Sequence, residues 1–171
     1  MLENDQLLLR APEPEDLALF YKWENDCKLW QFGSTIAPFS QYILKEYIAN
    51  AGGDFFAEKQ LRLVVTNKQT RQAIGNVDLF DFDPFHRRAA VGVLIDPDYQ
   101  AKGYATQALA IIKEYAFDFL GINMLYAHVP IANVQSVKLF EKSGYEKAGL
   151  LKSWLRNGDK YEDVLLLQIF K

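Results

Sequence analysis

The feature that most constrains the fold is a long amphipathic segment in the second half of the chain, with short apolar runs on both sides. Apolar residues recur through it at three- and four-residue steps and stop before Gly121: Ala105, Ala108, Leu109, Ile112, Ala116, Phe119 and Leu120. This spacing predicts one long helix. The flanking runs 89–95 and 124–129 have the length and composition of strands, so the pattern predicts a sheet with helices on its faces.

The rest of the chain repeats this alternation. Five further strands are expected, at 7–10, 61–66, 74–82, 145–151 and 162–170, with turns at 83–86 and 156–159. Three further helices are expected, at 15–24, 41–50 and 134–140, with Ser40 as N-cap of the second and Gly52-Gly53 as its end. The fold class is therefore α/β (α+β), in a single domain over residues 1–171.

Composition argues against several classes of function. The formal net charge is −3, which is unfavourable for a nucleic-acid partner. Cys27 is the one cysteine, and His86 and His128 lack the spacing of zinc ligands, so neither a disulfide nor a metal site is expected. No apolar run approaches the roughly 20 residues that cross a bilayer, and the N-terminus lacks a signal-peptide pattern. We therefore expect a cytoplasmic protein with no membrane partner.

A short segment before the long helix has the features of a phosphate-binding loop. It reads Gln100-Ala101-Lys102-Gly103-Tyr104-Ala105-Thr106. The first turn of a helix carries free backbone N–H groups and a partial positive charge, and small residues let a pyrophosphate approach them. Neither G-x-G-x-x-G nor G-x-x-x-x-G-K-[ST] occurs, so a dinucleotide or P-loop site is not expected. An ordinary strand-to-helix connection is the alternative.

Several motifs resemble those of the GCN5-related N-acetyltransferases (the GNAT superfamily), and together they span nearly the whole chain. Gln100-x-x-Gly103-x-Ala105 is similar to the family's pyrophosphate loop, and Asn133-x-x-Ser136 with 139–142 and 144–145 resembles its second cofactor segment. The segments 9–10, 15–16 and 23–26 resemble the branch of ribosomal-protein N-terminal acetyltransferases and spermidine acetyltransferases. The segments 78–81 and 86–89 resemble its spermidine-type members.

The resemblance implies a mixed, mostly antiparallel, twisted sheet flanked by helices and splayed between its two central strands, with acetyl-CoA in the gap. Backbone groups near Leu94 and Ile95 would then pair with the pantetheine arm. Backbone N–H groups from Ala101 to Thr106 would hold the pyrophosphate, with the rest of the loop around it.

The resemblance also assigns three side chains to the pantetheine and adenosine: Asn133, Ser136 and Lys142. Each has an alternative when the residues are considered alone. Asn133 is a good helix N-cap, and Ser136 could satisfy the same turn. Lys142 could equally be a solvated surface charge.

The implied chemistry needs a group that accepts a proton from the amine. A free alkyl amine has a pKa near ~10, so about one molecule in a thousand is nucleophilic at pH 7. Asp78 and Asp81 are candidates for an acidic floor that binds a cationic amine, with Asp78 preferred for relaying the proton through water. Strict alternation puts them on opposite faces, so both contribute only if the strand bulges or ends near Phe80. A solvated strand face is the alternative for Asp78.

The amine pocket would also draw on the N-terminal part of the chain. Trp23, Glu24 and Trp30 are the candidates there, although packing in the core is the usual role of tryptophan.

Two departures from the family bear on the catalytic residues. Many relatives carry a tyrosine at the position of Phe140, and its hydroxyl protonates the leaving thiolate. Many members of this branch carry a glutamate at the position of Ala90 that could serve as base. Because phenylalanine has no proton to donate, Ser136 is the predicted general acid, with Tyr145 as a second candidate.

The leading hypothesis is therefore an enzyme that moves the acetyl group of acetyl-CoA onto a primary amine by direct transfer in a ternary complex. The expected acceptor is small, cationic and polyamine-like. The alternatives are acetylation of a peptide N-terminus and a CoA-binding regulatory module that has lost catalysis. Tyr- and Phe-rich C-terminal strands make a homodimer plausible.

Overall fold

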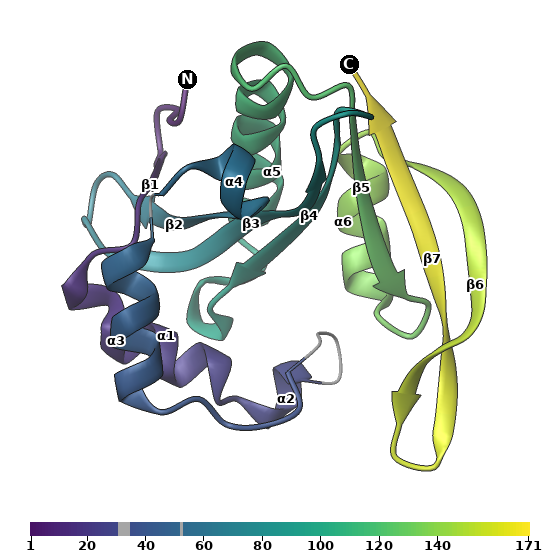
Figure 1. Ribbon diagram of the computed structural model, residues 1–171, viewed down its shortest axis with the longest axis horizontal. Helices are drawn as coiled ribbons and strands as arrows, with labels where there is room; N and C mark the ends of the chain where they lie inside the picture. Colours follow the sequence, from purple (N-terminus) through teal and green to yellow (C-terminus); the bar gives the residue numbers. More distant parts are fainter. Residues whose placement is uncertain (31–34, 52) are drawn as a thin grey trace.

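Seven strands form one mixed sheet, in the order β1-β2-β3-β4-β5-β7-β6 (Figure 1). The computed structural model describes residues 1–30, 35–51 and 53–171. The strands are β1 (Leu7–Arg10), β2 (Leu61–Asn67), β3 (Ala73–Asp83), β4 (Arg88–Ile95), β5 (Met124–Pro130), β6 (Glu146–Asn157) and β7 (Lys160–Phe170). All neighbours in the sheet are antiparallel except β4 and β5, which are parallel. The predicted fold class is confirmed.

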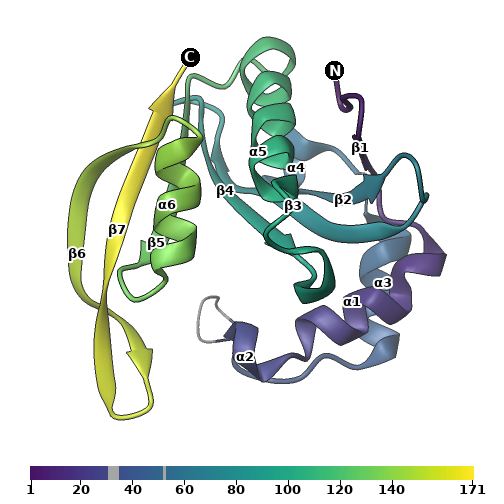
Figure 2. The same ribbon diagram turned by 180° about the vertical axis from the view of Figure 1, so that it is seen from behind.

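Helices cover both faces of this sheet. They are α1 (Leu17–Glu24), α2 (Cys27–Trp30), α3 (Gln41–Asn50), α4 (Phe55–Glu58), α5 (Tyr104–Glu114) and α6 (Val134–Lys142). Short 3-10 helices lie at Pro14–Asp16 and Pro97–Tyr99, and a π-helical turn at Tyr115–Phe119 extends α5. Figure 2 shows α5 and α6 together on one face. Ser40 caps α3 as predicted, whereas Gly52 lies outside the described residues.

The core follows from alternation along the strands. Ala89, Val91 and Ile95 of β4 are buried in one cluster with Leu109 and Ile112 of α5. On the other face of the sheet, a second cluster joins α1 and α3 to β2. Its buried members are Phe20, Leu44, Ile48 and Val64.

The sheet opens between its two central strands. β4 and β5 pair at three positions, ending at Ala90 opposite Tyr126, whereas β5 pairs with β7 from Met124 to Pro130. Figure 1 shows the two strands diverging beyond this contact. The predicted splay is therefore confirmed.

The C-terminal hairpin differs from its prediction. Its strands are longer, because Asn157 pairs with Lys160 and only two residues remain for the turn. β6 shifts register between Leu151 and Leu155, and Ser153 has φ 49°. This irregularity explains why the apolar pattern stopped at 151. The hairpin projects beyond the rest of the sheet (Figure 1).

Candidate active site

The edge of β4 that faces β5 carries unpaired backbone groups. The Asp96 N–H donates to the Ile74 C=O (2.9 Å), which makes Ile95 a non-hydrogen-bonded position of the β3–β4 ladder. Backbone groups alternate in direction along a strand, so those of Val93 and Ile95 point away from β3. Because β5 has already separated from β4 at this level, these groups face the opening.

This register moves the expected pantetheine contact by one residue. Leu94 lies opposite Asn76 in a hydrogen-bonded pair, so its own N–H and C=O are used by the ladder. Both backbone groups of Val93, and the N–H of Ile95, are free for a ligand instead. The Ile95 C=O accepts a hydrogen bond from Gln100 Nε2 (2.9 Å), which fixes the first residue of the loop against β4.

The loop leads into an open helix N-terminus. Gly103 is the N-cap of α5, has φ 79° and makes no side-chain cap. The first backbone bond into the helix runs from the Gln107 N–H to the Gly103 C=O (3.2 Å). In the described part of the chain, the N–H groups of Tyr104, Ala105 and Thr106 have no acceptor, as anion binding requires.

The loop around Gly103 is exposed and leaves room for a ligand. A Cβ at Gly103 would meet no heavy atom within 4 Å. Ala101 also has a positive φ of 60°. Lys102 lies over the ring of Tyr99 (5.3 Å) and donates to the Asp98 C=O (3.1 Å).

Asp96 ties this loop to α1. Its carboxylate, 3% exposed, accepts hydrogen bonds from Lys22 Nζ (2.7 Å) and Trp23 Nε1 (2.8 Å). It also caps the 3-10 helix by accepting from the Asp98 N–H. Burial raises the pKa of Asp96, but these hydrogen bonds outweigh burial and hold the pKa below its ordinary value. Trp23 is thus buried, with its indole N–H bonded to Asp96. Its predicted part in the amine pocket stays a prediction.

The N-terminus of α6 lies across the opening from β4. Asn133 is its N-cap and accepts from the Ser136 N–H (3.1 Å), while its contact with the cofactor stays a prediction. Ser136 is half-buried, and Lys142 is exposed on the last turn. Their contacts with cofactor, and the acid role of Ser136, stay predictions.

Asp78 lies in a polar cluster with two other charged residues. Arg62 Nε donates to Asp78 Oδ1 (2.7 Å), and a second guanidinium nitrogen donates to Oδ2 (3.1 Å). Glu24 pairs with the same guanidinium. Asn76 Nδ2 also donates to Asp78 Oδ2 (3.3 Å). The structure thus brings together Asp78 and Glu24, two candidates for the amine pocket, through a cation that the sequence analysis did not single out.

The cation of this cluster is well enclosed. The Arg62 guanidinium lies 5.7 Å from the ring centre of Phe20 and 5.6 Å from that of Tyr47. Burial lowers the pKa of Arg62, but Asp78, the larger opposing influence, and Glu24 raise it above its ordinary value. The arginine therefore remains charged and holds both carboxylates.

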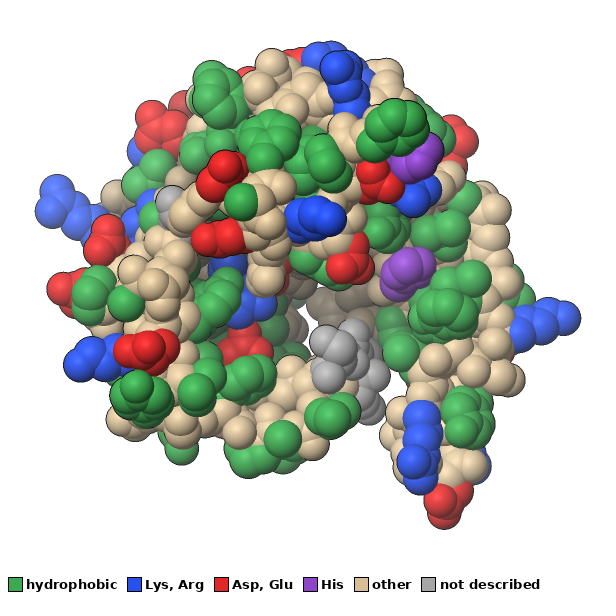
Figure 3. Space-filling view, viewed as in Figure 1, with side chains coloured by type: hydrophobic (Ala, Val, Ile, Leu, Met, Phe, Trp, Pro, Cys, Tyr) green, Lys and Arg blue, Asp and Glu red, His purple; other side chains and the backbone are tan. Residues whose placement is uncertain are grey.

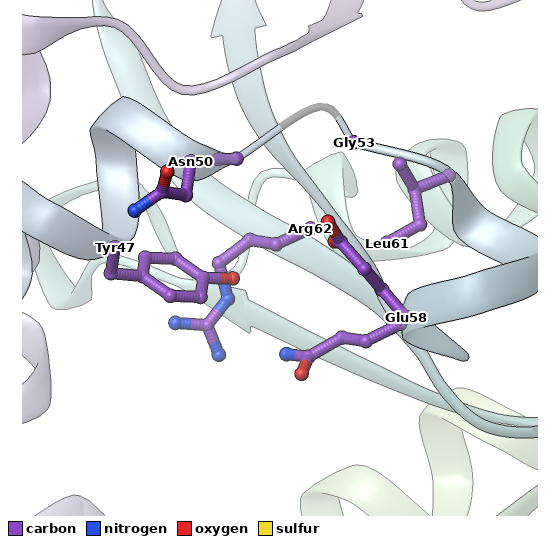
Figure 4. A pocket seen from close by; sticks show the side chains of 8 residues that line it. Tyr47, Asn50, Gly53, Glu58, Leu61 and Arg62 are labelled. Carbon is purple, nitrogen blue, oxygen red and sulfur yellow. The ribbon is translucent and has the colours of Figure 1, made fainter.

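A pocket of about 310 Å³ lies on the outer side of Arg62. Figure 4 shows Tyr47 and Asn50 of α3 on one side of it and Glu58 of α4 on the other. No lining residue comes from β4 or β5, so this pocket is separate from the opening of the sheet. Figure 3 shows a hollow in the molecular surface beside the projecting hairpin.

Of the two conditions that the sequence analysis set near Phe80, a bulge or a strand end, the structure has the bulge. Asp81 has φ 49°, and the β3–β4 register shifts between Phe80 and Asp83. Phe80 and Asp81 are both exposed as a result. Burial raises the pKa of the Tyr126 phenol, and the charge of the nearby Asp81 carboxylate adds to this rise.

The two departures from the family leave apolar groups at their positions. Phe140 is 4% exposed and packs edge-to-face on Tyr145, with ring centres 5.0 Å apart. The Tyr145 hydroxyl is buried without a hydrogen-bond partner in the described residues, and burial raises the pKa of this phenol. Tyr145 is therefore a weaker acid than a free tyrosine. Ala90 is buried on β4.

Comparison of the sequence with known protein families identifies the family of this chain. The family model described as "Acetyltransferase (GNAT) domain" matches residues 6–146. The chain belongs to the GNAT acetyltransferases. It is accordingly an N-acetyltransferase, and the family inferred from its motifs is confirmed.

Full-length relatives include spermidine acetyltransferases. The spermidine N(1)-acetyltransferase of Vibrio cholerae is 30% identical over 169 residues, covering 98% of this chain and 95% of its own. The Escherichia coli K12 enzyme of the same name is 26% identical over 164 residues, covering 95% and 85%. The structure of the Vibrio cholerae enzyme with CoA and spermine has a TM-score of 0.87 at 28% identity, over 98% and 96% of the two chains.

Two further features are absent from the described residues. No helix among them is long and apolar enough to cross a membrane. No cluster of three or more His, Cys, Asp or Glu side chains within the same residues could hold a metal ion.

Proposed function

We propose that this enzyme acetylates a small, cationic, polyamine-like primary amine by direct transfer from acetyl-CoA in a ternary complex. The observation that carries the proposal is the pairing of two donor sets beside one opening. One set is the free first turn of α5, and the other is the free edge of β4 at Val93 and Ile95. The first suits a pyrophosphate and the second suits the amide groups of pantetheine.

The acceptor class is supported by the relatives and by the charge of the site. Relatives at 26–30% identity are named for spermidine, and a structural neighbour holds CoA and spermine. Asp81 is exposed at the bulge beside the opening, where a carboxylate would attract an ammonium group. Asp78 and Glu24 are largely neutralised by Arg62, so we assign the first contact with the amine to Asp81.

The test is thiol release from acetyl-CoA with a panel of amines and peptides. Saturable release with spermidine or spermine supports the proposed acceptor. Release with peptides alone would instead identify an N-terminal acetyltransferase. CoA binding without any turnover would identify a regulatory module.

Assembly and location complete the proposal. A dodecameric structure of the Vibrio cholerae enzyme has a TM-score of 0.80 at 29% identity, which supports self-association of this chain. Light scattering on the purified protein tests this, and a monomer would contradict it. The cytoplasmic location expected from the sequence stays a prediction.

A further inference from the structure

His128 lies on β5 at the point where the sheet opens. The pairing of β4 with β5 ends at Ala90 and Tyr126, and His128 is two residues farther along. Because side chains alternate along a strand, His128 shares a face with Tyr126. Ala90 also lies opposite Phe80 of β3, so this is the face away from α5 on which Phe80 is exposed.

The imidazole is accessible and keeps its nitrogens free. His128 is exposed, and across residues 1–30, 35–51 and 53–171 it makes ring contacts but no hydrogen bond or ion pair. Its ring centre lies 5.5 Å from that of Tyr126 and 6.4 Å from that of Trp154. A neutral imidazole with an unused nitrogen can accept a proton, and histidine is the side chain suited to this near neutral pH.

The carboxylates near this face are less suited to the same task. Asp78 has both oxygens bonded to Arg62. Asp81 is exposed, and its charge helps to raise the pKa of Tyr126. An exposed carboxylate at this place suits the binding of a cation. Tyr126, beside His128, is within reach of the charges of Asp81, Asp83 and Arg88 of the β3–β4 hairpin. From β7 and β6 the neighbours are Leu166 and Trp154, which are uncharged.

We propose that His128 is the general base of the transfer, a role that rests on the proposed amine acetylation. An ammonium proton passes to an imidazole nitrogen, and the freed amine nitrogen bonds to the thioester carbonyl carbon. The carbon–sulfur bond then breaks, and the second proton of the attacking nitrogen passes to the thiolate, which leaves as CoA thiol. The imidazolium returns its proton to solvent. Tyr126 and Trp154 offer ring faces to the ammonium group before it loses its proton.

The test compares His128→Gln with His86→Gln. His86 is an exposed histidine in the β3–β4 turn, in contact with Phe85, and serves as the matched control. We expect His128→Gln to lower kcat for spermidine about 10²–10³-fold and to remove the acidic limb of the pH–rate profile. CoA affinity by calorimetry should be unchanged. Added imidazole should restore part of the kcat of His128→Gly, and His86→Gln should match the parent protein.

Three results would overturn this role. The first is a His128→Gln variant with parental kcat and pH profile. The second is a loss of kcat matched by an equal loss of CoA affinity, with no rescue by imidazole, since packing alone would explain it. The third is a parent protein that turns over no amine, which removes the proposed function as well. If the parent accepts only a peptide N-terminus, the polyamine acceptor fails while the base is tested on that peptide, whose ammonium must also lose a proton.

Discussion

At the scale of single residues, the proposed cofactor site consists of backbone N–H and C=O groups that side chains leave uncovered. Gly103 contributes no contact of its own, yet its positive φ starts α5 and its missing side chain leaves space at the free N–H groups. The charged side chains nearby are used differently. Asp96 forms an ion pair with Lys22, and Asp78 forms one with Arg62. These carboxylates therefore hold neighbouring elements in place and are not free to bind a ligand.

Gly103→Trp should weaken CoA binding by at least about tenfold, or about 1.4 kcal/mol, because an indole would occupy the pyrophosphate position. Gly158→Trp is the matched control. Gly158 also has a positive φ, 61° against 79°, and a Cβ at either glycine meets nothing within 4 Å. Both variants should therefore lose similar stability. Calorimetric titration with CoA separates them, and equal affinities would remove Gly103 from the site.

Asp78→Asn should lower the free energy of unfolding by about 1–3 kcal/mol, because Arg62 would lose one of its two carboxylate partners. Asp81→Asn is the comparison. Asp81 is exposed, so its unfolding free energy should change by less than about 0.5 kcal/mol. Urea unfolding measures both. An Asp78→Asn protein of parental stability but with a shifted pH–rate profile would favour the proton relay inferred from sequence over this structural role.

At the scale of elements, local periodicity was enough to predict the helices and strands that are regular. The apolar spacing of α5 and the short apolar run of β4 identified the strand, loop and helix of the proposed cofactor site. The bulge at Asp81 and the irregular β6 were harder, because a bulge inserts residues that no two-residue period anticipates. The prediction for Asp81 was conditional on a bulge or a strand end near Phe80.

Contacts between distant segments lay beyond the sequence pattern. Trp23 and Asp96 are 73 residues apart, so no spacing rule joins the indole N–H to that carboxylate. Arg62 was missed for the same reason, although a lone arginine in a buried strand was the available signal. His128 was considered only as a zinc ligand. Its importance emerges from the register that ends the β4–β5 contact beside it.

The link between α1 and the loop should make stability depend on pH through Asp96. Its pKa is lowered in the folded state, so its stabilising effect is present above the unfolded value of about 3.9 and is lost as pH falls through the folded value. Asp96→Asn should melt below the parent by a constant margin above about pH 5. The two melting temperatures should converge below about pH 4.

Thermal unfolding from acid to neutral pH measures this effect. Asp98→Asn is the control, because Asp98 is exposed and its carboxylate receives no bond from Lys22 or Trp23. If the difference in melting temperature between Asp96→Asn and the parent did not change with pH, the charge of Asp96 would not be what holds α1 to the loop. The packing and hydrogen bonds of the side chain would then hold it.

At the scale of the whole molecule, the sheet is nearly divided in two. The half from β1 to β4 meets the half from β5 to β7 through three pairs of residues. We expect a ligand in the opening to take the place of a missing strand, since β4 offers free N–H and C=O groups there. α5 reaches the opening with its N-terminus, and α6 begins just after β5. Binding of CoA should therefore join the halves.

We expect CoA to slow amide exchange in an alternating pattern along β4. The N–H groups of Val93 and Ile95 face the opening, whereas that of Leu94 is already bonded to β3. Residue-resolved exchange by NMR, with and without CoA, should show protection rising at Val93, Ile95 and the first turn of α5 while Leu94 changes little. An equal rise at all three strand positions would mean that CoA stiffens β4 as a whole. No rise at Val93 and Ile95 would place the pantetheine elsewhere, because a ligand that pairs like a strand can bond only to the groups that β3 leaves free.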